Sequence, residues 1–253
     1  MRLVSYNIMN GGEGRADPLA EVIQAQRPDV VVLVEADCPA VTARIAERLE
    51  MDSIEASGPR HTLAVLSRPR IVHSVNHAAL PRTRTVPRGG LLEVGLDGGL
   101  FLFAVHLGPG ADDESERARL EELDTVLSAI EESAGSSSAC VLAGDFNAVS
   151  PQAAIDPGRL RPLTRAQWDR NGGRLPREAV ARILRAGFRD SLETTDPKFA
   201  ATAGTLDTQH PGLRVDYVFV RNVFVAGAWI ETDRLATYAS DHYPVGAELR
   251  RQS

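Results

Sequence analysis

Asp145 and Asn147 follow a short apolar segment, in the stretch Cys140-Val-Leu-Ala-Gly-Asp-Phe-Asn147. The run 140–143 is typical of a buried strand, because it is too short and too sharply ended for a helix. Alternate residues of an extended chain point the same way, so the carboxylate and the amide are expected to project together. Ligands often bind at such strand ends in α/β sheets. Taken alone, however, the two residues are better explained as a turn after a strand.

Other polar side chains stand where an apolar strand begins or ends. They are Asn7, Glu35, His106, Asp216, and Asp241 with His242. Each has an ordinary structural explanation, such as a core histidine at 106, a pair between Asp216 and Arg214 or a nearby amide, and caps elsewhere. Taken together, they fit one chemistry, which is the hydrolysis of a phosphate ester.

Three of these side chains offer ligands for a metal ion. A hard divalent cation such as Mg²⁺ or Mn²⁺ prefers oxygen, and Asn7, Glu35 and Asp241 supply amide and carboxylate oxygens. The sequence contains no cysteine and histidine cluster that would bind a softer metal. In-line displacement at phosphorus needs such a cation, or cationic donors, for the charge that develops on the phosphoryl oxygens.

The remaining side chains suit the water, the phosphate and the proton transfers. Asp145 is suited to orient the attacking water, and Asn147 can donate a hydrogen bond to a phosphate oxygen. A histidine whose second nitrogen is held by a carboxylate is fixed in one tautomer, and its cation is stabilised. We expect Asp216 and His242 to form such a pair.

Alternating strands and helices must position these groups. Residues 2–8 and 29–35 are expected to be strands, joined by a helix that starts at Asp17-Pro18, which makes a parallel βαβ unit. No regular structure is expected within 150–175, and long loops of this kind are often functional. Further strands are expected near 53–56, 62–67, 70–76, 90–96, 100–106, 213–220, 223–230 and 244–249, and helices near 41–49, 113–132 and 177–186.

The bulk composition is that of a soluble globular protein. The 253 residues suffice for one large α/β domain or two small ones, and no linker divides them, so we expect a single domain over 1–253. The net charge of −6 gives no overall attraction to a polyanion, although a local basic cleft could still bind nucleic acid. The sequence shows no signal peptide, membrane span, disulfide framework or obligate protein partner, which predicts a cytoplasmic protein.

Six motifs carry the polar residues. They are Ser5-Tyr6-Asn7, Val32-Leu-Val-Glu-Ala-Asp37, Val105-His106-Leu107, Gly144-Asp-Phe-Asn147, Arg214-Val-Asp-Tyr-Val-Phe219 and Ser240-Asp-His-Tyr-Pro-Val245. In type and order they resemble those of the endonuclease/exonuclease/phosphatase superfamily, whose members include pancreatic-type deoxyribonuclease, apurinic endonucleases, neutral sphingomyelinases and inositol polyphosphate 5-phosphatases. Gly-Asp-Phe-Asn is a weak signal alone, whereas the ordered set is highly specific.

The resemblance implies an α/β fold, in which a four-layer sandwich is made of two mixed β-sheets flanked by helices. It also implies that Glu35 is the central ligand of a Mg²⁺ or Mn²⁺ ion. Asn7 and Asp241 would complete or support that site. Met9 stands where similar repair endonucleases often carry an acid, and Asn10 is the residue that could replace it.

The resemblance further implies the catalytic roles. Asp145 would activate or orient the water, and Asn147 would contact the phosphate. His242, oriented by Asp216, would bind the scissile phosphate or transfer a proton. His106 matches a histidine that part of the superfamily places beside the leaving group, where abasic-site enzymes usually have tyrosine.

We therefore expect a metal-dependent phosphodiesterase, with a nuclease acting on DNA or RNA as the leading interpretation. The alternative is a phosphoesterase of small molecules or lipid headgroups, which the acidic charge, His106 and the lack of an aromatic wedge favour. A catalytically inactive binding module is disfavoured, because each catalytic position that can be matched is filled. Substrate-binding residues are not identified, although arginines in the loops 81–90 and 150–175 would either grip phosphates or be merely solvated.

Overall fold

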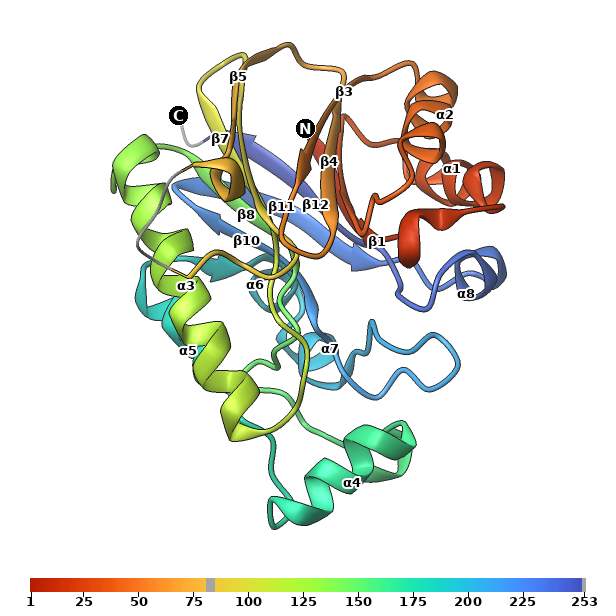
Figure 1. Cartoon of the computed structure of the whole chain (residues 1–253), viewed down its shortest axis with the longest axis vertical. Coiled ribbons are helices and arrows are strands. Elements are labelled where there is room, and N and C mark those ends of the chain that lie inside the picture. The colour runs from red at the N-terminus through yellow and green to blue at the C-terminus, as the bar shows by residue number, and fades with distance from the viewer. Residues whose placement is uncertain (81–84, 252–253) are drawn as a thin grey trace.

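The computed structural model describes residues 1–80 and 85–251, and it contains two β-sheets packed face to face between layers of helices (Figure 1). Each sheet has six strands and combines parallel with antiparallel neighbours. This is the four-layer α/β sandwich that the family resemblance implies. Residues 81–84 of the arginine-rich segment 81–90 lie outside the described residues.

The first sheet has the strand order β11-β12-β1-β2-β4-β3. Its strands are β1 (Arg2–Asn7), β2 (Val30–Val34), β3 (Asp52–Ser57), β4 (Thr62–Ser67), β11 (Val223–Ile230) and β12 (Val245–Arg251). β1 and β2 run parallel, with Leu3 opposite Val30 and Asn7 opposite Val34, which confirms the predicted βαβ unit. Asn7 and the residue that follows β2, Glu35, therefore emerge at the same edge of the sheet.

The second sheet has the strand order β5-β6-β7-β8-β10-β9. Its strands are β5 (Ile71–Asn76), β6 (Leu91–Leu96), β7 (Leu100–His106), β8 (Cys140–Asp145), β9 (Arg189–Asp190) and β10 (Asp216–Arg221). β7 and β8 are parallel and β10 is antiparallel to β8, so the end of β7, the end of β8 and the start of β10 meet.

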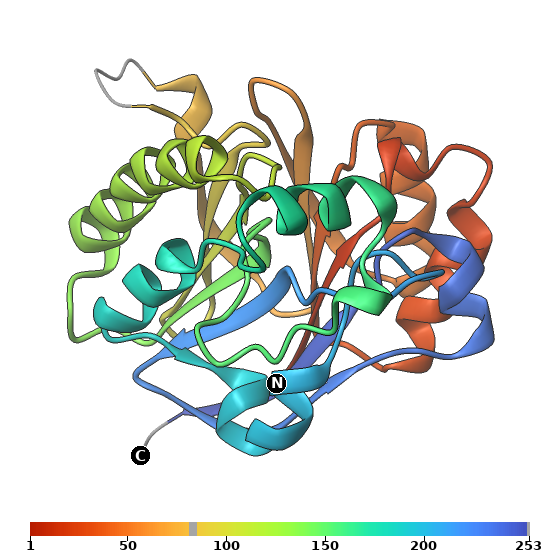
Figure 2. The same cartoon turned by 90° about the horizontal axis from the view of Figure 1, so that it is seen from below.

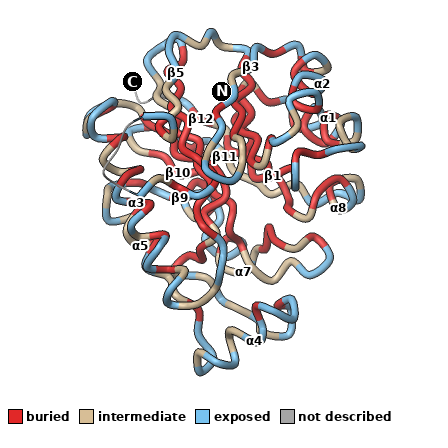
Figure 3. Tube along the Cα trace, in the orientation of Figure 1, coloured by how far each residue is buried: buried red, intermediate tan, exposed pale blue. Residues whose placement is uncertain are grey.

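Apolar side chains fill the spaces on both faces of the sheets. The central strands are accordingly buried (Figure 3). In β2 the side chains of Val30, Val32 and Val34 pack into the core between the sheets. Val31 and Leu33, which point the other way, pack against the outer helices. Because both faces of β2 are covered, its sequence is a continuous apolar run rather than an alternating one.

Helices cover the outer face of each sheet. Helices α1 (Ala16–Ala25), α2 (Pro39–Leu49) and α8 (Arg234–Ala239) lie on the first sheet, and α3 (Asp113–Ala134) and α5 (Glu178–Arg185) on the second. Shorter elements are α6 (Ser191–Thr195), α7 (Pro197–Thr202), and the 3-10 turns η1 (Asn10–Gly12), η2 (His77–Ala79) and η3 (Pro157–Arg159). No helix of the described residues is long and apolar enough to cross a membrane.

The expectation of an irregular segment at 150–175 is wrong in part. It contains η3 and the helix α4 (Pro162–Arg170), which starts with proline in its first turn. Only Thr164 of α4 is buried, so the helix has no apolar stripe by which a sequence pattern would reveal it. α4 lies beyond the sandwich at the bottom of Figure 1, and in the view from below it lies in front of the sheets (Figure 2).

Candidate active site

The edge of the second sheet carries three of the predicted side chains in one row. His106 ends β7, Asp145 ends β8 and Asp216 begins β10. The register places His106 opposite Asp145, and Asp145 opposite Asp216. Neighbouring strands lie about 4.8 Å apart, so strand pairing alone brings the three residues together. All three are buried.

The end of β8 and the turn that follows it position Asp145 and Asn147. Gly144 has φ of 145°, and a Cβ at this position would lie 1.9 Å from the carbonyl oxygen of Val105, so only glycine fits. The backbone N–H of Asn147 donates to Asp145 Oδ1 at 2.9 Å. The side-chain amide of Asn147 donates to the carbonyl of Leu107 at 2.9 Å, which leaves a second N–H for a ligand.

Asp216 and His242 form the predicted pair. His242 Nδ1 lies 2.8 Å from Asp216 Oδ2, and its Nε2 lies 3.9 Å from Asp145 Oδ2. Burial opposes a charge on His242, but the charge of Asp216 and the hydrogen bond to it outweigh burial and raise the pKa of His242 to about 10. The alternative partner for Asp216, Arg214, is instead 2.6 Å from Asp190.

His106 lies on the other side of Asp145, with its Nε2 3.7 Å from Asp145 Oδ2. Burial lowers the pKa of His106 to about 4, so its ring is neutral at pH 7. Burial and the charge of Asp216 raise the pKa of Asp145 to about 7. Asp145 thus stands between a neutral and a cationic histidine, with a pKa suited to accepting a proton near neutral pH.

Asn7 joins the two sheets at this edge. Its side-chain amide donates to Glu35 Oε1 and to Asp145 Oδ2, at 3.1 Å each. Its side-chain oxygen accepts from the backbone N–H of Met9, and the backbone N–H of Asn10 donates to Glu35 Oε2 at 2.8 Å. Burial alone would raise the pKa of Glu35, but these bonds from Asn10 and Asn7 hold it below its usual range. Asn7 therefore supports both carboxylates, and Asn10 contributes its backbone.

Glu35 and Asp241 have the environment of cation ligands. Glu35 has φ of 58°, an unfavourable conformation for a residue with a side chain, just where β2 ends. Asp241 Oδ1 is buried, and it has no hydrogen-bond partner among the described residues. Burial raises the pKa of Asp241, and the charge of Glu35 raises it further. Like charges and an unpartnered buried oxygen are what a divalent cation would satisfy, so the donor set fits a hard metal ion.

Comparison with known proteins identifies the family. A family model described as the Endonuclease/Exonuclease/phosphatase family matches residues 4–242, which is nearly the whole chain. The chain belongs to this family. Members of the endonuclease/exonuclease/phosphatase family hydrolyse phosphoester bonds and depend on divalent metal ions. No curated protein sequence matches the chain.

Solved structures of this family share the fold at low sequence identity. A 3′ phosphatase from Neisseria bound to a product DNA hairpin is 20% identical, with 99% of each chain covered and a TM-score of 0.70. An AP endonuclease from Archaeoglobus fulgidus is 16% identical, with 98% of each chain covered and a TM-score of 0.71. A mannosyl-6-phosphatase from Bacteroides thetaiotaomicron is 19% identical, with 99% of each chain covered and a TM-score of 0.69.

Six of the predicted residues line one cavity of about 380 Å³. Asn7 and Asp216 do not line the cavity. Asn7 donates hydrogen bonds to Glu35 and Asp145, and Asp216 pairs with His242, and these three partners do line it. The predicted residues in its wall are Glu35, His106, Asp145, Asn147, Asp241 and His242. Four basic residues also line it, namely Arg60, His61, Arg88 and Arg161. Arg88 and Arg161 belong to the loops 81–90 and 150–175, whose arginines are considered for phosphate binding from the sequence, whereas Arg60 and His61 were missed. Arg60 and His61 lie between β3 and β4, in a loop without a periodic pattern that would single them out.

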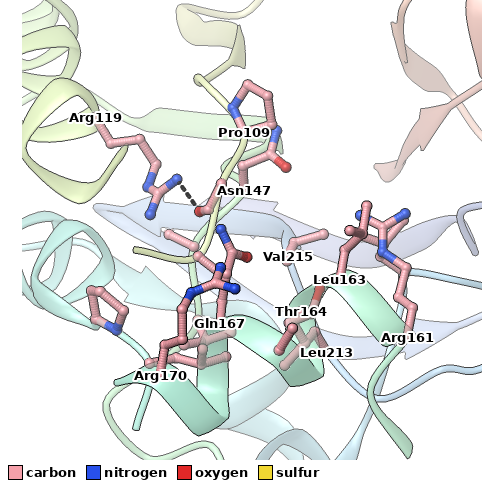
Figure 4. Close-up of a pocket in the computed structure, with 18 residues that line it drawn as sticks. Pro109, Arg119, Asn147, Arg161, Leu163, Thr164, Gln167, Arg170, Leu213 and Val215 are labelled. Atoms are coloured by element: carbon pink, nitrogen blue, oxygen red, sulfur yellow. Dashed lines mark hydrogen bonds between the residues drawn. The ribbon is translucent and has the colours of Figure 1, made fainter. Parts of the chain in front are cut away.

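A second cavity of about 390 Å³ adjoins the first, and Asn147, Pro109 and Arg161 line both (Figure 4). Its wall combines apolar side chains, such as Leu213 and Val215, with polar groups from α4. The loop 108–110 between the cavities is fixed by the buried Arg119, whose guanidinium donates to the carbonyls of Gly108 and Gly110 at 3.0 and 2.7 Å.

Proposed function

We propose that the protein is a Mg²⁺- or Mn²⁺-dependent phosphodiesterase that acts on DNA or RNA. One observation carries the proposal, which is that Asp145 lies between neutral His106 and cationic His242 in the same cavity as Glu35 and Asp241. A base for water, a cation for phosphate and oxygen ligands for a metal thus face one space, as phosphoester hydrolysis requires.

Glu35 and Asp241 would hold the metal ion, and Asn7 would keep Glu35 in place. When bound, the cation would supply Lewis-acid stabilisation of the charge that develops on the phosphoryl oxygens. Its positive charge would also offset the two effects that raise the pKa of Asp241, which are burial and then repulsion from Glu35.

The other side chains activate the water, bind the phosphoryl oxygens and contact the leaving group. Asp145 orients a water molecule and accepts its proton as the oxygen attacks phosphorus. His242, held as a cation by Asp216, donates from Nε2 to a phosphoryl oxygen, and the spare N–H of Asn147 donates to another. His106 is neutral and can present one N–H toward the leaving oxygen.

The two cavities favour a diester over a monoester. A diester carries a group on each side of the phosphorus, and the second cavity provides space beside Asn147 for one of them. Arg60, Arg88 and Arg161 offer positive charge along the same path, although the chain is acidic overall. The similarity to a DNA-bound 3′ phosphatase and to an AP endonuclease supports nucleic acid as the substrate class.

A substrate screen with metal replacement tests this function. Single-stranded DNA, abasic-site duplex, RNA, sphingomyelin and the diester and monoester of p-nitrophenol would be incubated with Mg²⁺, Mn²⁺ or EDTA. We expect nucleic acid to be cleaved, EDTA to abolish cleavage, and the diester to be preferred. Cleavage that EDTA leaves unchanged, or no hydrolysis of any ester, would contradict the proposal; the latter result would indicate a binding module.

A matched pair of variants tests the role of the second cavity. Arg161→Ala removes a charge shared by both cavities, whereas Arg234→Ala removes an exposed charge on α8 that lines neither. We expect Arg161→Ala to lower kcat/KM for the diester about tenfold more than for the monoester, and Arg234→Ala to change neither. An equal loss on both esters would mean that Arg161 does not distinguish them.

A phosphatase of small molecules is the second candidate. The net charge of −6 and the similarity to a mannosyl-6-phosphatase favour it. Salt separates the two functions, since binding to a phosphate backbone weakens steeply as salt rises. Inhibition of monoester hydrolysis by DNA that disappears between about 50 and 200 mM salt would indicate a nucleic-acid site. Monoester hydrolysis that DNA never inhibits would favour the phosphatase.

A further inference from the structure

His61 forms a second pair of histidine and carboxylate at the active-site cavity. Its Nδ1 lies 2.8 Å from Asp37 Oδ2, and Asp37 Oδ1 accepts the backbone N–H of Thr62 at 2.7 Å. These two contacts hold the carboxylate of Asp37 in place, and the carboxylate in turn sets the orientation of the His61 ring. With Nδ1 engaged, Nε2 is the nitrogen that His61 can offer to a ligand.

His61 faces His106 across the cavity wall. The two ring centroids are 5.2 Å apart with a 32° angle between the planes. A ligand atom from each of Glu35, His61 and His106 lies within 4.8 Å of the other two, and all three line the same cavity. His61 is half-buried and His106 buried, so the cluster is reached from the cavity rather than from open solvent.

Glu35 can still bind a cation together with His61 and His106. Each of its oxygens accepts one hydrogen bond, from Asn7 and from the backbone of Asn10. An ionised carboxylate has about four acceptor positions, so both oxygens keep a lone pair. The comparable cluster of Asp145, Asp216 and His242 differs, because the 2.8 Å bond between Asp216 and His242 already uses two of its members.

We propose that Glu35, His61 and His106 form a second cation site, which takes a first-row transition-metal dication such as Mn²⁺, Co²⁺ or Zn²⁺ in preference to Mg²⁺. Imidazole nitrogen is a good ligand for these metals, whereas Mg²⁺ demands oxygen. Two histidines and one carboxylate with open positions form a known arrangement for such ions. Asp37 is the outer carboxylate that orients a metal-binding histidine. The inference rests on the proposed function in that Glu35 serves both cations, and a His106 that binds the second cation no longer donates to the leaving oxygen.

Metal titration of designed variants tests the site without reference to activity. His61→Asn keeps an amide nitrogen near the position of Nδ1 for Asp37 but has none at Nε2. Asp37→Asn keeps His61 but removes the orienting charge. The control is His73→Asn, because His73 bonds to Glu93 at 3.0 Å in a similar pair that does not line the cavity.

Co²⁺ would be titrated into each full-length protein in excess Mg²⁺, with the visible d–d absorption as the readout. We expect the wild-type protein and His73→Asn to bind one Co²⁺ with equal Kd. Asp37→Asn should bind it about 10- to 100-fold more weakly, and His61→Asn at least as weakly. Circular dichroism and melting curves would confirm that the variants are folded.

Pulsed electron paramagnetic resonance of bound Cu²⁺ would count the coordinated imidazoles. Two are expected in the wild-type protein and one in His61→Asn. Absence of nitrogen coupling in the wild-type protein, or equal Co²⁺ affinity in His61→Asn, would overturn the inference and show that Asp37 and His61 form only a structural pair. The proposed hydrolysis is judged separately, from activity with Mg²⁺ alone, so each proposal can fail while the other stands.

Discussion

His242 Nδ1 lies 2.8 Å from Oδ2 of Asp216, and both side chains are buried. The hydrogen bond fixes which nitrogen faces the cavity, since Nδ1 is engaged and Nε2 points toward Asp145. Burial would favour a neutral ring, but Asp216 reverses that preference and raises the pKa of His242 to about 10. The pair therefore maintains a positive charge where a phosphate would bind.

The first prediction concerns stability and pH. The pKa of His242 is higher in the folded chain than its unfolded value of about 6.5. Its contribution to stability is therefore fully present below pH 6.5 and is lost as pH rises through about 10. Urea unfolding in EDTA should show His242→Gln less stable than wild type by a few kcal/mol at pH 6, with the gap closing toward pH 10. A gap independent of pH would mean that His242 is neutral in the folded chain.

The second prediction concerns Asp145 as the base. Asp145→Asn keeps an oxygen that can accept from Asn7 but cannot take a proton from water. General-base catalysis contributes about 10²- to 10⁴-fold, so kcat should fall by that factor while KM changes little. Steady-state kinetics on the best substrate from the screen would measure it, with the exposed hairpin variant Asp97→Asn as the control. A kcat within tenfold of wild type would mean that a group other than Asp145 accepts the proton of the attacking water.

The parts of the fold that could be predicted are those with a local signal. Val30 to Val34 form an uninterrupted apolar run that predicts β2, and the ordered motifs indicate the fold and single out Glu35, Asp145 and His242. The register that sets His106 beside Asp145 could not be read from spacing, because it joins strands far apart in the chain. The family resemblance implies only that His106 stands beside the leaving group.

Two different physical causes explain why sequence reasoning missed His61 and α4. His61 lies in a turn between strands, and its importance depends on Asp37 and His106, which come from separate parts of the chain. The helix α4 is polar on most of its surface, so nothing in its composition distinguishes it from a loop. Asp37 closes the motif that contains Glu35, but its partner His61 comes from a later turn, so the pair depends on the fold.

The third prediction concerns the glycine of Gly-Asp-Phe-Asn. A methyl group at Gly144 would lie 1.9 Å from the carbonyl oxygen of Val105, and its φ of 145° disfavours any side chain. Gly144→Ala should cost at least about 1–3 kcal/mol of unfolding free energy and displace Asp145. Gly227→Ala is the control, because no heavy atom lies within 4 Å of the added Cβ in β11. Equal stability of the two variants in urea would show that β7 moves away from the added methyl group without loss of unfolding free energy.

The last prediction concerns the buried ion pair behind the site. Arg214 lies 2.6 Å from Asp190, and its guanidinium stacks 4.3 Å from the ring centre of Tyr217. Both charged side chains are buried, so Asp190→Ala leaves an arginine without its counter-charge. Removing one partner of a buried pair costs about 3–5 kcal/mol, and the loss should appear in urea unfolding.

The matched controls for this prediction separate charge burial from simple loss of contact. Asp169→Ala breaks the exposed pair with Arg165 on α4 and should cost less than about 1 kcal/mol. The double variant Asp190→Ala with Arg214→Met removes both buried charges and should be more stable than Asp190→Ala alone, since no unpaired charge remains. If the double variant were instead the less stable of the two, Arg214 would contribute mainly through its packing on Tyr217 rather than through its charge.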